Sequence, residues 1–183
     1  MSIVTKSGDQ GATGLMFNRR VSKCHPRVEA CGSVDELNAA IGLARATAVE
    51  ASVQNQLLGI QRVLVALMGE LATSVEDLER YTQAGFAHLT PDDTAKLETL
   101  VAELESRHPA LAGWAIPGGT IHSAAVDMAR TVCRRAERRV CSLSEAGELR
   151  NREILIYLNR LSDLLWLLAR SSEGLPATGT TLV

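Results

Sequence analysis

The apolar residues of this chain of 183 residues recur at helical spacing in several long segments, and that pattern constrains the fold most strongly. It is clearest over residues 52–74, where steps of four and three positions separate Val53, Leu57, Ile60, Leu64, Leu67 and Leu71. Such spacing puts one apolar stripe along a helix, as in helical bundles. Aromatic residues make up only 3% of the chain, so Leu, Ala, Val and Ile must fill the core. We therefore expect an all-α fold rather than a β-sandwich.

Five helices and no convincing strand are expected from this periodicity. They cover residues 26–48, residues 52–74, residues 91–108, a long segment over residues 120–143, and a last segment over residues 148–168. Residues 75–90 are predicted to be a loop. The expected organisation is one domain over residues 1–183, with a Gly-rich leader loop at 1–24, an antiparallel five-helix bundle at 26–172 and a flexible tail at 173–183.

Composition argues against several classes of function. The net charge of −2 lacks the basic signature of proteins that bind nucleic acids or anionic membranes. No apolar stretch approaches the ~20 residues of a membrane helix, and the N-terminus lacks the apolar core of a signal peptide. The four cysteines form no CxxC pair, so we expect reduced thiols and a cytoplasmic location. A single Glu105-Ser-Arg-His108 motif is not the paired motif of a di-iron bundle, and no metal site is expected.

The segment ARTVCRRAERR, residues 129–139, carries five arginines inside a predicted helix. Arg130, Arg134 and Arg138 are spaced by four residues and share a face with Glu137. Their mutual repulsion favours an anionic ligand, and guanidinium groups match the oxygen atoms of a polyphosphate. A solvated charged face, partly neutralised by Glu137, is the alternative.

The leader segment TKSGDQGATG, residues 5–14, places three glycines among hydroxyl residues and Lys6. It does not match the pattern GxxxxGK[ST], so it is not a P-loop. Closely spaced glycines can still direct several backbone N–H groups toward one anion. A disordered leader is the alternative. Two anion-seeking elements far apart in the sequence nevertheless suggest one triphosphate held between them.

Two polar residues stand among the apolar positions of the predicted helices. Asp35, in SVDELNAAIG, is either a surface charge or the partner of a buried arginine. Asn159, in YLNRLSD, is either a structural hydrogen-bonding residue or a group that binds the ring or sugar of a ligand. The sequence leaves both pairs of alternatives open.

With these motifs, the chain resembles the PduO-type ATP:cob(I)alamin adenosyltransferases from Val4 to Arg170. The segments that carry the resemblance are TKSGDQGATGL, RVSKCHPRVEACGSVDELNAAIG, WAIPGG, ARTVCRRAERRV and YLNRLSDLLWLLAR. Their order and spacing are specific to that family. The sequence departs from the family pattern at Ser7, where Thr is usual, and at Asn18, where Gly is common.

The resemblance implies a five-helix bundle, in agreement with the periodicity, and a homotrimer with active sites between subunits. ATP with Mg²⁺ would be bound by the leader of one subunit through Thr5, Lys6, Ser7, Gly8, Thr13, Gly14 and Lys23. The neighbouring subunit would bind the same ATP through Arg134, Arg135, Glu137, Arg138 and Asn159. Asp35 and Arg130 would pair across the interface near the corrin. The implied catalytic set is Arg134, Arg130, Asp35 and Glu137.

The resemblance also implies a reaction. The cobalt of cob(I)alamin attacks the 5′-carbon of ATP, which gives adenosylcobalamin and inorganic triphosphate. Cobalt must first be reduced from Co(II), and in the family an aromatic residue before the PGG turn displaces the lower axial ligand. Trp114 corresponds to that residue, and simple packing in a loop is the alternative. A reductase and an adenosylcobalamin-dependent client enzyme are implied partners.

Two other functions compete with the transferase. A regulator or cofactor-delivery protein on the same fold would bind ATP or adenosylcobalamin with negligible turnover. A purely structural bundle would bind no nucleotide, and it would leave the arginine-rich helix face unexplained.

Overall fold

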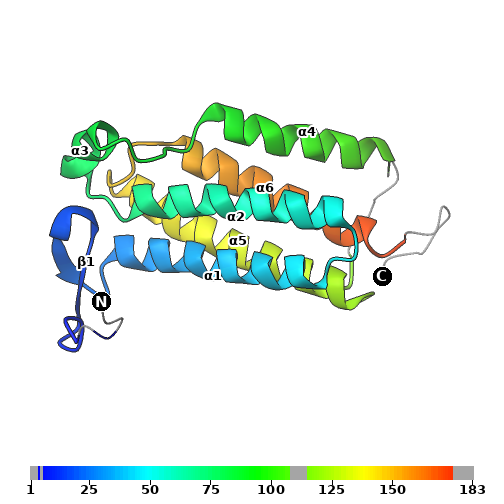
Figure 1. Ribbon diagram of the computed structural model, residues 1–183, viewed down its shortest axis with the longest axis horizontal. Coiled ribbons are helices and arrows are strands. Elements are labelled where there is room, and N and C mark those ends of the chain that lie inside the picture. The colour runs from blue at the N-terminus through cyan, green and yellow to red at the C-terminus, as the bar shows by residue number, and fades with distance from the viewer. Residues whose placement is uncertain (1–3, 5, 108–114, 175–183) are drawn as a thin grey trace.

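The computed structural model describes residues 4, 6–107 and 115–174, and these are mostly helical (Figure 1). The α-helices are α1 (Pro26–Thr47), α2 (Ala51–Leu71), α3 (Leu78–Gln83), α4 (Pro91–Arg107), α5 (Ile121–Glu145) and α6 (Glu153–Ser171). The expectation of an all-α fold is therefore confirmed. The described residues form six α-helices, however, where five were expected.

The additional helix, α3, lies inside the segment 75–90 that was predicted to be a loop. It follows the short 3-10 helix η2 (Val75–Asp77). Tyr81 of α3 is buried, and its hydroxyl donates a hydrogen bond to the carbonyl oxygen of Ala87 at 3.1 Å. A helix of six residues is too short to show an apolar period, so tertiary burial of Tyr81, rather than local pattern, selects this structure.

The leader also contains regular structure that the sequence did not reveal. Strands β1 (Ala12–Gly14) and β2 (Arg20–Ser22) pair antiparallel, with Thr13 opposite Val21, and the 3-10 helix η1 (Met16–Asn18) connects them. Strands of three residues cannot display a convincing alternation of apolar and polar residues. The prediction of no strand was wrong here for that reason.

Helix α5 is central to the packing and contacts both α1 and α6 along its length. Figure 1 shows α1, α2, α5 and α6 running side by side, with α4 alongside α6. The buried face of α5 consists mainly of small residues: Ser123, Ala125, Val126, Ala129, Cys133, Ala136 and Val140. Such side chains let neighbouring helices approach closely, and larger residues from α1 and α6, such as Leu37 and Leu161, fill the remaining core.

The start of α5 is fixed by a capping box. The Thr120 hydroxyl accepts a hydrogen bond from the backbone N–H of Ser123, and the Ser123 hydroxyl accepts one from the N–H of Thr120, each at 2.9 Å. Two donors of the first turn are thereby satisfied. The predicted start near Thr120 is confirmed.

Arg27 connects three chain segments at one end of the bundle. Its side chain is 3% exposed and donates to the carbonyl oxygens of Leu71 at 3.2 Å and Thr73 at 2.8 Å. It also forms an ion pair with Glu148 at 2.8 Å. One buried guanidinium thus joins the start of α1, the end of α2 and the connection between α5 and α6.

Among the described residues, no single helix has both the length and the apolar character to cross a membrane. Helix α2 and the following segment Val75–Gln83 meet those requirements only as a pair bent by 103°, on length and composition alone.

Gly69 of α2 provides a test of the contact with α3. A Cβ atom at this position would overlap the Tyr81 hydroxyl, which its hydrogen bond to Ala87 holds in place. We expect Gly69→Ala to lower the free energy of unfolding by about 1–3 kcal/mol, as overpacked sites do. The measurement is urea denaturation followed by circular dichroism.

The matched control is Gly59→Ala on the same helix. Gly59 is exposed, and a Cβ there would have no neighbour within 4 Å. This substitution should raise stability by about 0.5–1 kcal/mol, because alanine restricts the unfolded chain. Equal stability changes in the two variants would contradict the packing of Tyr81 against α2.

Candidate functional site

The glycine-rich part of the leader is a folded loop that continues into the β1–β2 hairpin. The backbone N–H of Lys23 donates to the carbonyl of Gly11 at 2.8 Å, and Gly11 N–H donates to Gly8 at 3.2 Å. The Arg20 guanidinium donates to the carbonyl of Ser7 at 2.7 Å. Gly11 has a φ of 77°, which few side-chain-bearing residues tolerate. The alternative of a disordered leader is therefore wrong for the described residues.

The hairpin is in turn attached to the bundle. Met16 N–H donates to the carbonyl of Ala72 at 2.8 Å, and Arg19 pairs with Asp77 at 2.8 Å. The hydrogen bond and charge of Arg19 hold the pKa of the Asp77 carboxyl below its usual value. Asn18, which departs from the family pattern, has a φ of 63°. Asparagine tolerates this left-handed backbone better than most residues, so Asn18 is compatible with the turn.

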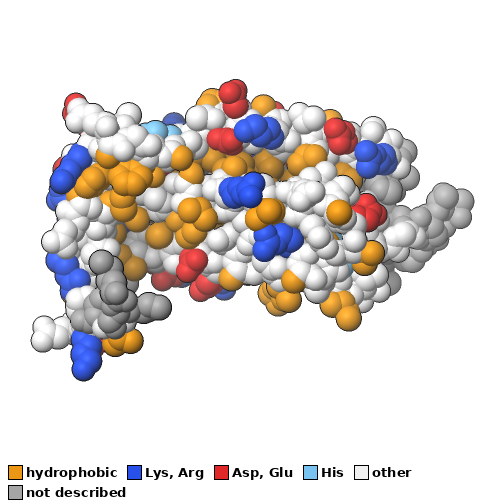
Figure 2. Space-filling model, in the orientation of Figure 1, with side chains coloured by type: hydrophobic (Ala, Val, Ile, Leu, Met, Phe, Trp, Pro, Cys, Tyr) orange, Lys and Arg blue, Asp and Glu red, His pale blue; other side chains and the backbone are white. Residues whose placement is uncertain are grey.

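The predicted ATP contacts in the leader lie together at one end of the molecule. Lys6, Ser7, Gly14 and Lys23 are exposed, whereas Gly8 and Thr13 are half-buried. A Cβ on Gly8 would come within 3.1 Å of Lys23 Nζ, so the Lys23 ammonium lies over the glycine loop. Thr5 lies outside the described residues. Figure 2 shows several Lys and Arg side chains along this end, which therefore favours an anionic ligand.

The arginines of α5 form a second basic surface, and most are held by carboxylates. Arg134 pairs with Glu137 at 2.9 Å, and Asn159 of α6 donates to Glu137 at 3.0 Å. Arg135 pairs with Glu36 of α1. Arg134, Arg135 and Arg138 are all exposed. The structure therefore brings Arg134, Glu137 and Asn159 into one connected group, as a shared ligand site requires.

Arg130 differs from its neighbours on α5. It is half-buried and pairs within the chain with Asp127, whose Oδ1 accepts from Arg130 Nε at 3.1 Å. Asp35 is exposed on α1. Within the described residues Arg130 therefore pairs with Asp127, and its expected pairing with Asp35 of another subunit stays a prediction.

Sequence reasoning missed Asp127 and Glu36. Asp127 precedes Arg130 by three residues, a spacing that puts the two side chains on one helix face and could have revealed the pair. Glu36 reaches Arg135 from another helix, so no local spacing could have identified it.

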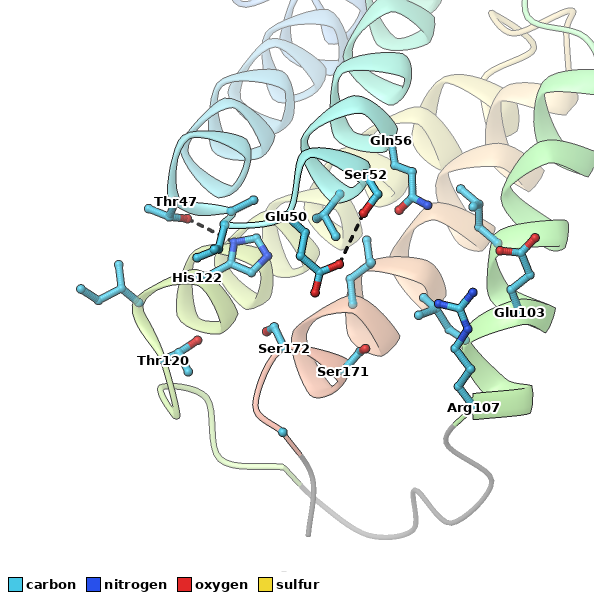
Figure 3. A pocket seen from close by; sticks show the side chains of 18 residues that line it. Thr47, Glu50, Ser52, Gln56, Glu103, Arg107, Thr120, His122, Ser171 and Ser172 are labelled. Atoms are coloured by element: carbon cyan, nitrogen blue, oxygen red, sulfur yellow. Dashed lines mark hydrogen bonds between the residues drawn. The ribbon is translucent and has the colours of Figure 1, made fainter. Parts of the chain in front are cut away.

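A cavity of about 790 Å³ lies at the opposite end of the bundle from the leader. It is bordered by the α1–α2 connection, the end of α4, the start of α5 and the end of α6 (Figure 3). Glu50, Gln56, Glu103, Arg107 and His122 are among its lining residues, so its wall is partly polar. Trp114 lies outside the described residues, but the described residues Arg107 and Thr120, before and after it in sequence, both line this cavity.

The described residues show no group of three or more His, Cys, Asp or Glu side chains able to hold a metal ion. The four cysteines are free thiols. Burial raises the pKa of the Cys133 thiol, which donates to the carbonyl of Leu158 at 3.2 Å. Cys133 therefore acts as a small core residue of α5.

Comparison with known proteins shows a relationship over nearly the whole chain. Residues 3–172 match the sequence model of a family described as cobalamin adenosyltransferase. The chain is 41% identical over 169 residues to a cobalamin adenosyltransferase of Cupriavidus metallidurans, covering 92% of this chain and 86% of that protein. It is 38% identical over 178 residues to the corrinoid adenosyltransferase PduO of Salmonella typhimurium, covering 95% of this chain. The chain spans only 50% of the length of that PduO protein.

Solved structures show the same likeness in three dimensions. A variant of the PduO-type ATP:corrinoid adenosyltransferase from Lactobacillus reuteri, complexed with cobalamin and ATP, superposes with a TM-score of 0.87. The two sequences are 35% identical, and the match covers 94% of each chain. Another variant of that enzyme, complexed with ATP, superposes with a TM-score of 0.82 at 33% identity, again covering 94% of each chain.

The hydrogen bond from Arg20 to Ser7 predicts a measurable property of the leader. In Arg20→Ala, the amide hydrogens of residues 6–11 should exchange faster, because the loop loses its side-chain attachment to β2. The free energy of unfolding should change by less than about 0.5 kcal/mol, since the contact is exposed. Hydrogen exchange followed by mass spectrometry measures the first effect. Arg150→Ala, at an exposed position outside the leader, is the control, and unchanged exchange in Arg20→Ala would rule out this attachment.

Proposed function

Because this chain belongs to the cobalamin adenosyltransferase family, we propose that it is an ATP:cob(I)alamin adenosyltransferase. It transfers the 5′-deoxyadenosyl group of ATP to cob(I)alamin and releases inorganic triphosphate. The observation that carries this proposal is the match over 92–95% of the chain to proteins named for this activity. We further propose a single-domain enzyme that acts in the cytoplasm, with the five long helices forming its bundle.

The two basic surfaces are proposed to bind the triphosphate of ATP. The leader contributes backbone N–H groups and the charges of Lys6 and Lys23, while α5 contributes the guanidinium groups of Arg134, Arg135 and Arg138. Mg²⁺ enters as part of the ATP complex. Glu137 holds both Arg134 and Asn159, so it orients two ATP-binding groups rather than contacting phosphate through its own charge.

The active site is proposed to lie between subunits of a homotrimer. Helix α1 begins three residues after Lys23, and its last residue, Thr47, lines the cavity beside the start of α5. Its 22 residues span about 33 Å at 1.5 Å per residue. Within one subunit, the leader and the turn that follows Trp114 therefore lie at opposite ends of the bundle. A neighbouring subunit can bring a leader to the α5 arginines and close the site.

The proposed chemistry needs no general base. The cobalt of cob(I)alamin donates an electron pair to the 5′-carbon of ATP, and the bond from that carbon to the triphosphate oxygen breaks. The electron pair of the broken bond leaves with triphosphate, and no proton is removed. The protein must align cobalt with carbon and neutralise the charge that grows on the leaving group. Arginine and lysine side chains can neutralise the charge on the leaving triphosphate. The reaction therefore needs no catalytic triad of a nucleophile, a histidine and an acid.

The corrinoid is proposed to lie near the α5 start, with Trp114 displacing its lower axial ligand and Asp35 pairing with Arg130 across the interface. The cavity beside the α5 start supports this placement, because two of its lining residues, Arg107 and Thr120, precede and follow Trp114 in the sequence. A reductase would supply the electron for Co(II), and a client enzyme would take the adenosylcobalamin product.

An anaerobic absorbance assay tests the proposed function. Cobalamin is reduced chemically, the protein is added with ATP and Mg²⁺, and the cob(I)alamin band is followed. We expect the band to disappear while a light-sensitive alkylcobalamin and free triphosphate form. Persistence of the band, with ATP binding still seen by calorimetry, would instead identify a regulator or cofactor-delivery protein. Absence of ATP binding would identify a structural bundle.

Shared active sites predict complementation between two inactive variants. Lys23→Ala damages the leader, and Arg134→Ala damages the α5 surface, so each homomeric variant should lose at least about tenfold in kcat/KM for ATP. In a mixed trimer, the intact leader of an Arg134→Ala subunit meets the intact α5 surface of a neighbouring Lys23→Ala subunit at one of the three sites. One site in three is therefore undamaged. Co-expressed, doubly tagged trimers should therefore recover about one third of wild-type activity.

In the control experiment, the variant Arg139→Ala is used in place of Arg134→Ala. Arg139 is equally exposed on α5 and pairs with Glu29 at 3.1 Å, but it is not among the proposed ATP contacts. Its homomeric variant should remain near wild-type activity. If the mixed Lys23→Ala and Arg134→Ala trimers are as inactive as the two parents, each site lies within one subunit and the interface proposal is wrong.

A further inference from the structure

Ionic contacts that are buried at their centre, together with one backbone hydrogen bond, connect Arg130 to the glycine turn that precedes α5. This buried ion network consists of Arg130, Asp127, Arg170, Glu173 and the backbone N–H of Gly119. Asp127 accepts from Arg130 through Oδ1 at 3.1 Å and from Arg170 through Oδ2. Arg170 also lies 3.4 Å from Glu173 Oε1, which accepts from Gly119 N–H at 3.3 Å.

The core of this network is almost completely shielded from water. The side chains of Arg170 and Asp127 are 4% and 5% exposed, and that of Glu173 is 16% exposed. Two guanidinium groups face two carboxylates, so the network is electrically neutral. Arg170 Nε is nevertheless buried without a hydrogen-bond partner within the described residues. Buried ion pairs of this kind contribute little net stability compared with well-packed apolar residues, so stability does not explain the network.

The network fixes the position of both groups that it joins. Asp127 accepts from Arg130 through Nε, and neither Nη group of Arg130 donates a hydrogen bond among the described residues. At the other end, a Cβ on Gly119 would come within 2.8 Å of Glu173 Oε1. The turn is therefore packed directly against the carboxylate. Arg170 of α6 thus connects Asp127, in the first turns of α5, with the Gly118–Gly119 turn that precedes α5.

We infer that the buried ion network positions Arg130 relative to the Gly118–Gly119 turn, and so aligns the two elements that meet the corrinoid. This inference rests on the proposed function. Asp127, Arg170 and Glu173 are positioning residues, because they act through Arg130 and the turn rather than by touching the substrate. Corrinoid use should depend on the network, whereas ATP binding, which involves the leader and Arg134, should not.

Glu173 is the most suitable residue for the test, because it is at the edge of the network and its loss should leave the fold intact. We expect Glu173→Ala to raise the KM for the corrinoid about tenfold, with the KM for ATP changed less than about twofold. Glu173→Gln keeps an oxygen that can accept from Gly119 N–H, so it should recover most of the loss. A structural defect would instead affect both substrates together.

The matched control is Glu148→Ala at the opposite end of the bundle. Glu148 also pairs with a buried arginine, Arg27, which is 3% exposed. Its loss should lower thermal stability without changing the ratio of the two KM values. A double-mutant cycle completes the test: in the Arg130→Ala background, Glu173→Ala should add no further change to the corrinoid KM. Additive effects would overturn the inference.

A readout independent of activity separates this inference from the proposed function. Amide hydrogen exchange over residues 115–121 should accelerate in Glu173→Ala and remain unchanged in Glu148→Ala. Failure of the wild-type protein to make alkylcobalamin would overturn the proposed function alone. Unchanged exchange in Glu173→Ala, or an unchanged corrinoid KM in an active enzyme, would overturn the network as a positioning device.

Discussion

The close packing of α5 against α1 and α6 is the constraint on which the rest of the structure depends. Ala129, Cys133 and Ala136 are fully buried, and their small side chains allow the helix axes to approach. Because one face of α5 is used in this way, the arginines at the intervening positions must face outward. A single helix therefore forms the centre of the core and also displays the charged surface proposed to bind triphosphate.

Charge on that surface is organised by carboxylates from several helices. Arg134 pairs with Glu137 on its own helix, whereas Arg135 and Arg139 pair with Glu36 and Glu29 of α1. Exposed pairs of this kind contribute little to stability, but they reduce repulsion among neighbouring guanidinium groups and restrict their orientations. We expect this restriction to lower the entropy lost when an anion binds to the surface.

Both ends of the bundle are organised by a buried arginine. Arg27 joins three chain segments near the leader, and Arg170 joins α5, α6 and the glycine turn at the other end. Arg27 donates to two backbone carbonyl oxygens and pairs with Glu148, whereas Arg170 pairs with the carboxylates of Asp127 and Glu173. The two proposed substrate-binding elements, the leader and the turn, lie at opposite ends of the same helices, each at an end that contains one of these arginines.

The sequence by itself determined the all-α class, the approximate extents of the long helices, the start of α5 near Thr120 and the arginine-rich face. All of these follow from local spacing and residue type, which act over a few neighbouring positions. The short helix α3, the hairpin in the leader, the pairing of Arg135 with Glu36 and the buried ion network were decided only by the tertiary structure. Each depends on groups far apart in the chain, such as Asp127 and Arg170. Tyr81 and Arg170 become buried only when the helices pack, so their contacts contribute to the free energy of folding only in the tertiary structure.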